Sequence, residues 1–228
     1  MYESGKFEDI LNFCKTLLVK DSKNLTGLQN TVTALLHLHR YEEALEFCNI
    51  VLEMDDSDTY ALKNKVSALE SLHRYDQVLE CCHKLLSIDD KDTWSINSTA
   101  LALNELNKNE EAISFYNKTI ELEPDNLTAL MNKALSLTHL KKYEESIFFY
   151  DKVQQTDSSL KEAASGKFEA FKKIGKENEA FLAAQGVLLK DMEKIISDAA
   201  KNKCTVFHQF CLNELDILEK KRHEMQSK

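Results

Sequence analysis

Cysteine and histidine are the residues of this sequence whose spacing could form a metal site. Cys204, His208 and Cys211 are separated by four and three residues, so a helix through them would carry three zinc ligands on one face. The alternative is a terminal helix that buries small and aromatic side chains against the preceding structure. We favour this structural interpretation, and we predict no metal site and no cofactor.

The remaining cysteines follow a regular spacing that favours a structural role. Cys14, Cys48 and Cys82 are 34 residues apart, and no pair of cysteines has the C-x-x-C spacing of a redox or zinc motif. Neighbouring helices pack about 10 Å apart, which is too far for equivalent cysteines to form a disulfide. We therefore expect buried thiols in the core.

No other combination of residues has the pattern of an active site. The sequence lacks a glycine-rich phosphate loop, a nucleophile elbow and an H-E-x-x-H zinc motif. The histidines His37, His39, His73 and His83 are scattered, and most fall in expected turns, where a structural role is the simpler explanation. We predict that the protein is not an enzyme.

The structural unit of the chain is best seen in a stretch of 34 residues from Thr93 to Asn126. Its polar step Asn107-Lys108-Asn109 separates two blocks, and Pro124 ends the second block. In each block apolar and small residues recur at intervals of three and four, as on one helix face: Ile96, Ala100, Leu103 and Leu106, then Ala112, Ile113, Tyr116 and Ile120. The stretch is therefore predicted to form a helix-turn-helix unit.

The pattern of this unit returns every 34 residues along the chain. Columns of equivalent residues show the repeat in both helices of each unit. Three of these columns are Ala34, Ala68, Ala102, Ser136 and Ala170; Leu35, Leu69, Leu103, Leu137 and Phe171; and Ala44, Val78, Ala112, Ser146 and Ala180. The period, the small residues in the columns and the Pro-Asp-Asn ending resemble the tetratricopeptide repeat, over roughly residues 7 to 190.

The resemblance implies an all-α fold, an α-solenoid in which antiparallel helix pairs stack into a right-handed superhelix. We place a half-repeat at residues 1–24 and five repeats at 25–194, with the rest of the chain, 195–228, forming the end of a long helix and a capping helix. The five repeats are 25–58, 59–92, 93–126, 127–160 and 161–194. An apolar stripe from Phe181 to Ala199 predicts one continuous helix over 177–201, and the final helix is expected from about Cys204 to Met225.

Two details of each unit can be predicted from the columns. The turn between its helices should contain a residue that tolerates a left-handed or bridging backbone, namely His39, His73, Asn107, Lys141 or Gly175. The core should bury Ala68, Leu69, Ala102, Leu103 and Ile113 deeply.

Composition limits the classes of partner. The 228 residues carry a net charge of -9, whereas nucleic acids and anionic membranes attract concentrated Lys and Arg. No apolar run approaches the roughly 18 residues of a membrane span, and the N-terminus lacks the pattern of a signal peptide. We therefore expect a cytoplasmic protein that binds neither nucleic acid nor membrane.

The resemblance also implies a binding role, because proteins of this family hold a peptide or helix of a protein partner in a groove lined by the first helix of each unit. The groove residues on this sequence would be Asn30, Tyr60, Lys63, Asn64, Trp94, Asn97 and Asn132. Asparagines in one column would bond a partner's backbone, and exposed aromatic rings would anchor it. The alternatives are surface asparagines typical of the repeat and aromatic rings half-buried between repeats.

Two further interpretations stay open. The family's carboxylate clamp, which holds acidic chaperone tails, needs five cationic and amide residues, of which only Lys63 fits in one register and only Asn64 in the other. We therefore expect a neutral polar groove. The half-repeat at residues 1–24 indicates either a fragment of a longer array or a helix that packs against another molecule. The protein would accordingly be a scaffold, a self-assembling homo-oligomer, or the regulatory part of a larger protein.

Overall fold

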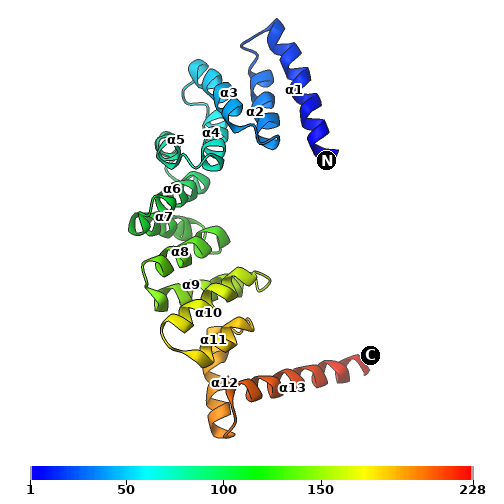
Figure 1. Cartoon of the computed structure of the whole chain (residues 1–228), viewed down its shortest axis with the longest axis vertical. Helices are drawn as coiled ribbons and strands as arrows, with labels where there is room; N and C mark the ends of the chain where they lie inside the picture. The colour runs from blue at the N-terminus through cyan, green and yellow to red at the C-terminus, as the bar shows by residue number, and fades with distance from the viewer. Residues whose placement is uncertain (1, 227–228) are drawn as a thin grey trace. The chain divides into compact units, whose positions relative to one another are not determined.

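The computed structural model describes residues 2–226, including the side chains of residues 5–214, 216 and 217. All regular structure in this part of the chain is α-helical, and it contains no strand (Figure 1). The helices are α1 (Tyr2–Lys20), α2 (Leu25–His37), α3 (Tyr41–Met54), α4 (Thr59–Ser71), α5 (Tyr75–Ile88), α6 (Thr93–Glu105), α7 (Asn109–Leu122), α8 (Leu127–His139), α9 (Tyr143–Thr156), α10 (Lys161–Lys173), α11 (Glu177–Ala184), α12 (Leu189–Lys201) and α13 (Val206–Gln226). The predicted all-α solenoid of helix pairs is therefore confirmed.

The turn inside each helix pair adopts the conformation that the sequence predicted. The turn residues have positive φ angles, with values of 57° at His39, 56° at His73, 60° at Asn107 and Lys141, and 74° at Gly175. In the first of these turns the N–H of Arg40 donates to the carbonyl oxygen of Leu35 at 2.9 Å, and the N–H of His39 donates to that of Leu36 at 3.1 Å. These bonds satisfy carbonyl groups at the end of α2, which explains why a left-handed residue recurs at each turn.

The chain divides into two compact units, Met1–Pro124 and Asp125–Lys228. In the first unit, which contains α1 to α7, the small residues at the helix contacts are fully buried, and Ala68, Leu69 and Ala102 share one core cluster. Leu103 is also buried, whereas Ile113 is only half-buried, so its predicted depth was wrong. Cys14, Cys48 and Cys82 are buried free thiols, as predicted.

The second unit, which contains α8 to α13, departs from the prediction of one helix over 177–201. The helix α11 ends at Ala184, and α12 begins only at Leu189. Gly186 has a φ of +77° in the connection between them, a conformation that glycine adopts without strain. The apolar stripe that suggested one helix is buried in part, because Met192, Ile195 and Ala199 belong to one core cluster and Phe181 packs against it, but two helices supply these residues.

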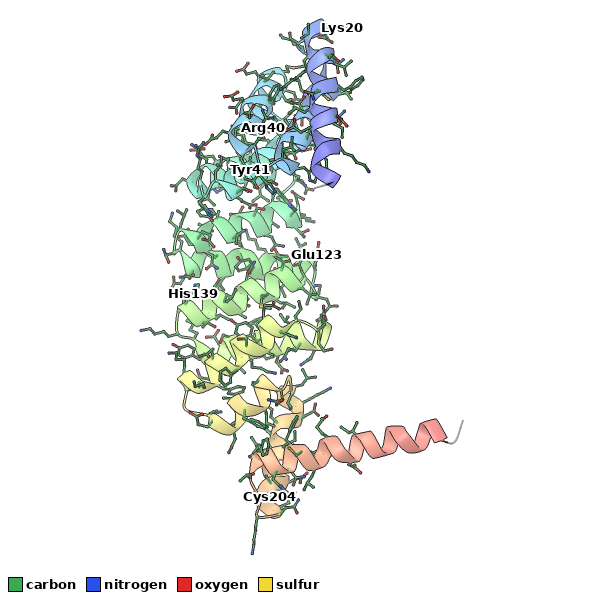
Figure 2. The ribbon with its side chains drawn as sticks, turned by 45° about the vertical axis from the view of Figure 1, so that its right-hand side comes forward. Lys20, Arg40, Tyr41, Glu123, His139 and Cys204 are labelled. Atoms are coloured by element: carbon green, nitrogen blue, oxygen red, sulfur yellow. The ribbon has the colours of Figure 1, made fainter. Side chains whose placement is uncertain are left out.

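The last helix covers the end of this unit. It begins at Val206, two residues later than expected, and its first turns pack against α11 and α12. Phe181 of α11 meets the rings of Phe207 and Phe210 at centroid distances of 5.6 and 5.8 Å. Figure 2 shows Cys204 at the bend between α12 and α13. The proposed capping helix is thus present, although Cys204 lies outside it.

Candidate functional site

The first helices of the first unit lie side by side, since α2 packs against α4 and α4 against α6. We call the surface formed by their predicted groove residues the first-helix face. Within this unit it consists of Asn30, Tyr60, Lys63, Asn64, Trp94 and Asn97.

Trp94 is the largest exposed side chain of the first-helix face, with 36% of its surface accessible. The ammonium group of Lys63 lies 5.3 Å from the centroid of the Trp94 ring and 3.0 Å from Oδ1 of Asp92. Burial raises the pKa of the Asp92 carboxyl, but hydrogen bonds from Ser95 and Lys63 outweigh it, so the pKa lies below its usual range. The negative charge of Asp92 therefore holds Lys63 beside the indole ring.

Tyr60 occupies the equivalent place on α4 and is 43% exposed. Its hydroxyl group is hydrogen-bonded to that of Thr33 on α2 at 2.5 Å, which orients the ring across two first helices. One turn further along α4, Nδ2 of Asn64 donates to the carbonyl oxygen of Tyr60 at 2.8 Å. The amide nitrogen of Asn64 thus has a partner within its own helix, while its side chain stays half-buried.

Two oxygen atoms in this region are buried without a hydrogen-bond donor among the described residues. They are Oδ1 of Asn97 on α6 and Oε1 of Glu70 on α4. Burial raises the pKa of Glu70, and a hydrogen bond with Ser98 opposes this effect. Both side chains are half-buried as a whole, although these two oxygen atoms are themselves buried.

The other predicted groove residues lie in different surroundings. Asn30 is exposed on α2 and lines a hollow that it shares with residues of α1. Asn132 is half-buried on α8 of the second unit, and it is therefore described apart from the first-helix face. All seven residues lie on first helices, as the sequence predicted. Lys63 contacts Trp94 of the neighbouring helix α6, and Asn64 bonds to Tyr60 within α4.

Sequence reasoning missed a buried polar cluster in the second unit. Nζ of Lys167 lies 2.7 Å from Oδ1 of Asp151 and donates to the carbonyl oxygen of Val187 at 2.8 Å. The N–H of Leu189 also donates to Asp151, and Gln155 donates to its second oxygen. Lys167 stands in a column with Thr31, Lys65, Thr99 and Lys133, in which the threonines are buried but the other two lysines are only half-buried, so the register by itself did not indicate that the charge of Lys167 is buried.

The alternative metal site at the C-terminus has no support in the geometry. Cys204 precedes α13, and its Sγ faces Oε1 of Gln209 at 3.7 Å. Among the described residues, no three His, Cys, Asp or Glu side chains are grouped as metal ligands. The buried thiols are poor nucleophiles, because burial raises the pKa of Cys48 and of Cys82 to about 12. No helix of the described chain combines the length and apolar character of a membrane span.

Part of the chain is similar in sequence to a known protein family. Residues 71–153 match the sequence profile of a family described as anaphase-promoting complex, cyclosome, subunit 3. No curated protein sequence matches significantly.

Many solved structures are similar to the chain. A tetratricopeptide repeat protein from Parabacteroides merdae has a TM-score of 0.70 at 17% identity, covering 80% of this chain and 72% of its own. MamA from Desulfovibrio magneticus RS-1 has a TM-score of 0.65 at 18% identity, covering 70% and 90%. YrrB, described as a TPR protein with an unusual peptide-binding site, has a TM-score of 0.63 at 15% identity, covering 76% and 89%.

At sequence identities this low, the similarity to these three structures shows the fold alone. All three are solenoids built from helix pairs of the same kind. Together with the 34-residue period and the left-handed turns, they show that the chain has the fold of a tetratricopeptide repeat solenoid.

Proposed function

We propose that this protein is a non-enzymatic scaffold that holds a segment of a partner protein on its first-helix face. The observation that carries the proposal is the exposed ring of Trp94 on α6, which Lys63 contacts while it is paired with Asp92; the neighbouring helix α4 carries a second exposed ring, Tyr60. Aromatic side chains that are rigid and accessible are the residues that most often anchor a protein interface.

The polar groups of the face suit a peptide backbone. The buried Oδ1 of Asn97 has no donor among the described residues, so a rotation of this half-buried side chain toward the surface would let a backbone N–H of a bound segment complete its bonding. Asn64 offers its remaining oxygen, because its nitrogen is occupied by the carbonyl of Tyr60. Since Asp92 neutralises Lys63, the face does not select a strongly acidic partner. Asn30 would extend the binding surface along α2, and Asn132 is proposed as a contact residue of the second unit by itself.

YrrB gives limited support from outside the chain, because its description as a peptide-binding TPR protein shows that this fold can bind peptides. The proposed partner is a protein rather than nucleic acid or membrane, in keeping with a net charge of -9. All six cysteines are free thiols, which is usual in a reducing compartment, and we accordingly propose that the protein acts in the cytoplasm.

The experiment is a titration of a partner captured with the full chain as bait. We expect Trp94→Ala to weaken binding about thirtyfold, since a buried aromatic anchor contributes about 2 kcal/mol. Ile88→Ala is the matched control, because it removes an apolar side chain of similar exposure from a second helix of the same unit. Equal affinities of the partner for the parent and the two variants would show that the partner does not bind on the first-helix face.

Homotypic assembly is the second candidate, and light scattering of the purified chain tests it. A concentration-independent monomer mass would exclude it, whereas a larger stable mass would favour contacts through α1 or α13 over a scaffold of separate partners. A regulatory role within a larger protein is compatible with either result.

A further inference from the structure

Two lysines and two phenylalanines form a cluster on α8 and α9, in the second unit. Nζ of Lys133 on α8 lies 3.7 Å from the ring centroid of Phe149 on α9. Nζ of Lys152 on α9 lies 5.9 Å from the same centroid and 5.1 Å from the centroid of Phe148. The two rings meet edge to face at a centroid distance of 5.3 Å. We call these four residues the lysine–phenylalanine patch.

The ring of Phe148 is 50% exposed, although the repeat does not require an aromatic residue at this position. The equivalent residues of α1, α3, α5 and α7 are polar and exposed: Asn12, Glu46, Glu80 and Ser114. On α11 the equivalent residue, Leu182, is apolar but buried. A large apolar side chain that stays exposed here is therefore particular to α9, and exposed aromatic rings are frequent anchors of protein interfaces.

The two lysines lie close together without a carboxylate in contact. Among the described residues, neither Lys133 nor Lys152 forms an ion pair. Burial lowers the pKa of Lys133; the charge of the exposed Glu145 opposes this effect, and the charge of Lys152 adds to it. The ring faces attract the ammonium groups but leave their N–H donors available to an anion.

From these contacts we propose that the lysine–phenylalanine patch binds an acidic segment of a partner protein, with a carboxylate between the two lysines and an apolar side chain against Phe148. Two neighbouring ammonium groups repel each other, and a carboxylate between them relieves this repulsion and accepts a hydrogen bond from each.

The size of the anionic partner follows from the charge of the whole chain. A net charge of -9 repels an extended polyanion such as a nucleic acid or an anionic membrane, whereas a short segment with one or two carboxylates matches a site with two cations. The patch shares no residue with the first-helix face. It also takes a different partner, because the first-helix face does not select acidic segments.

The test uses the full chain and a fluorescein-labelled peptide with the sequence GDEFDELG, which combines carboxylates with apolar side chains. A second peptide, GNQFNQLG, replaces each carboxylate with an amide and keeps the apolar residues. Fluorescence anisotropy measures the binding of both. We expect saturable binding of the acidic peptide and at least about tenfold weaker binding of the amide peptide. Raising NaCl from about 0.05 M to about 0.5 M should also weaken binding of the acidic peptide, because salt screens exposed charges.

Variants of the patch locate the bound peptide. The double variant Lys133→Gln, Lys152→Gln should weaken binding of the acidic peptide at least about tenfold, and Phe148→Ser should weaken it about threefold. The replaced side chains are half-buried or exposed, and circular dichroism checks that the variants keep their helical content. The comparison of the two peptides and of the two salt concentrations on the parent does not depend on the variants.

Lys118→Gln is the matched control. Nζ of Lys118 lies 5.0 Å from the ring centroid of Phe115, and these two residues on α7 are the equivalents of Lys152 and Phe149. Thr99 takes the place of the second lysine there, so a single cation faces the ring. We expect Lys118→Gln to bind the acidic peptide with the affinity of the parent.

Four outcomes would overturn the proposal. The first is no saturable binding of the acidic peptide, and the second is equal binding of the two peptides or equal binding to the parent and the double lysine variant. The third is loss of binding in Trp94→Ala, which would assign the peptide to the first-helix face. The fourth is a parent dimer that the double lysine variant dissociates, which would make a second copy of the chain the occupant. Failure of the Trp94 test described above would leave this proposal intact, so the two can fail separately.

Discussion

Lys167 and Asp151 form an ion pair with an N–O distance of 2.7 Å in a place where the lysine side chain is 0% exposed. The pair has hydrogen bonds in addition to its charges, because Lys167 donates to the carbonyl of Val187 and Asp151 accepts from the N–H of Leu189. Val187 lies in the connection between α11 and α12, and Leu189 is the first residue of α12. The ion pair thus fixes the point at which the regular repeat ends.

Removing the ammonium group should destabilise the second unit strongly. Lys167→Met leaves the carboxylate of Asp151 buried without its counter-charge, and breaking such a pair costs about 3–5 kcal/mol. We expect a loss of this size in the free energy of unfolding, measured with urea. Lys173→Met, which alters an exposed lysine of the same helix, should change it by less than about 0.5 kcal/mol.

The backbone of the connection offers a second measurement on the same pair. In Asp151→Leu the N–H of Leu189 loses its acceptor, and its hydrogen exchange should become faster than in the parent. Unchanged protection of Leu189 would show that the packing of α12 alone holds the connection.

Gly166 on α10 is required by a close approach of Tyr150. A Cβ atom at this position would lie 2.4 Å from the tyrosine ring, whereas one at Gly5 on α1 would meet nothing within 4 Å. Gly166→Ala should therefore lower the free energy of unfolding by about 1–3 kcal/mol through overpacking. Gly5→Ala should raise it by about 0.5–1 kcal/mol, because alanine favours a helix. A stabilised Gly166→Ala variant would mean that Tyr150 can move aside.

Glu70 should make the stability of the first unit depend on pH. Burial raises its pKa in the folded protein, so the folded state binds more protons than the unfolded state in the range just above the ordinary pKa of a glutamate. Stability from this group is therefore greatest at low pH and is lost as pH rises through that range. We expect Glu70→Gln to be more stable than the parent at pH 7, and this advantage should shrink toward pH 4.

The control for this experiment is Glu111→Gln, which changes an exposed glutamate at the start of α7. Urea unfolding at both pH values measures each difference. A Glu70→Gln variant whose advantage is the same at pH 4 and pH 7 would show that the carboxyl group does not titrate differently in the folded state.

The thiols should divide by reactivity. Burial raises the pKa of Cys48 and Cys82 to about 12, and Cys14 and Cys81 are also buried, whereas Cys204 and Cys211 are partly exposed. Because the thiolate is the reactive form, an alkylating reagent at pH 8 should modify the two partly exposed cysteines of the native protein and all six after denaturation. Mass spectrometry counts the added groups, and rapid native labelling of Cys48 would contradict the assigned core.

The sequence by itself determined the helices of the regular repeats and their turns. Apolar columns with a fixed period specify which face of each helix is buried, and this information is local enough to read from spacing alone. The positive φ angles at His39, His73 and Asn107 follow from the same register, since each residue follows the end of a first helix.

Only the tertiary structure decided the end of the array and the details of the first-helix face. The stripe from Phe181 to Ala199 has the same spacing whether one helix or two carry it. The break at Gly186 depends on Asp151 and Lys167, which are distant in sequence. In the same way, the position of Lys63 beside Trp94 depends on Asp92, 29 residues away. Periodicity reports burial along one helix, but it does not show which charged side chains meet after folding.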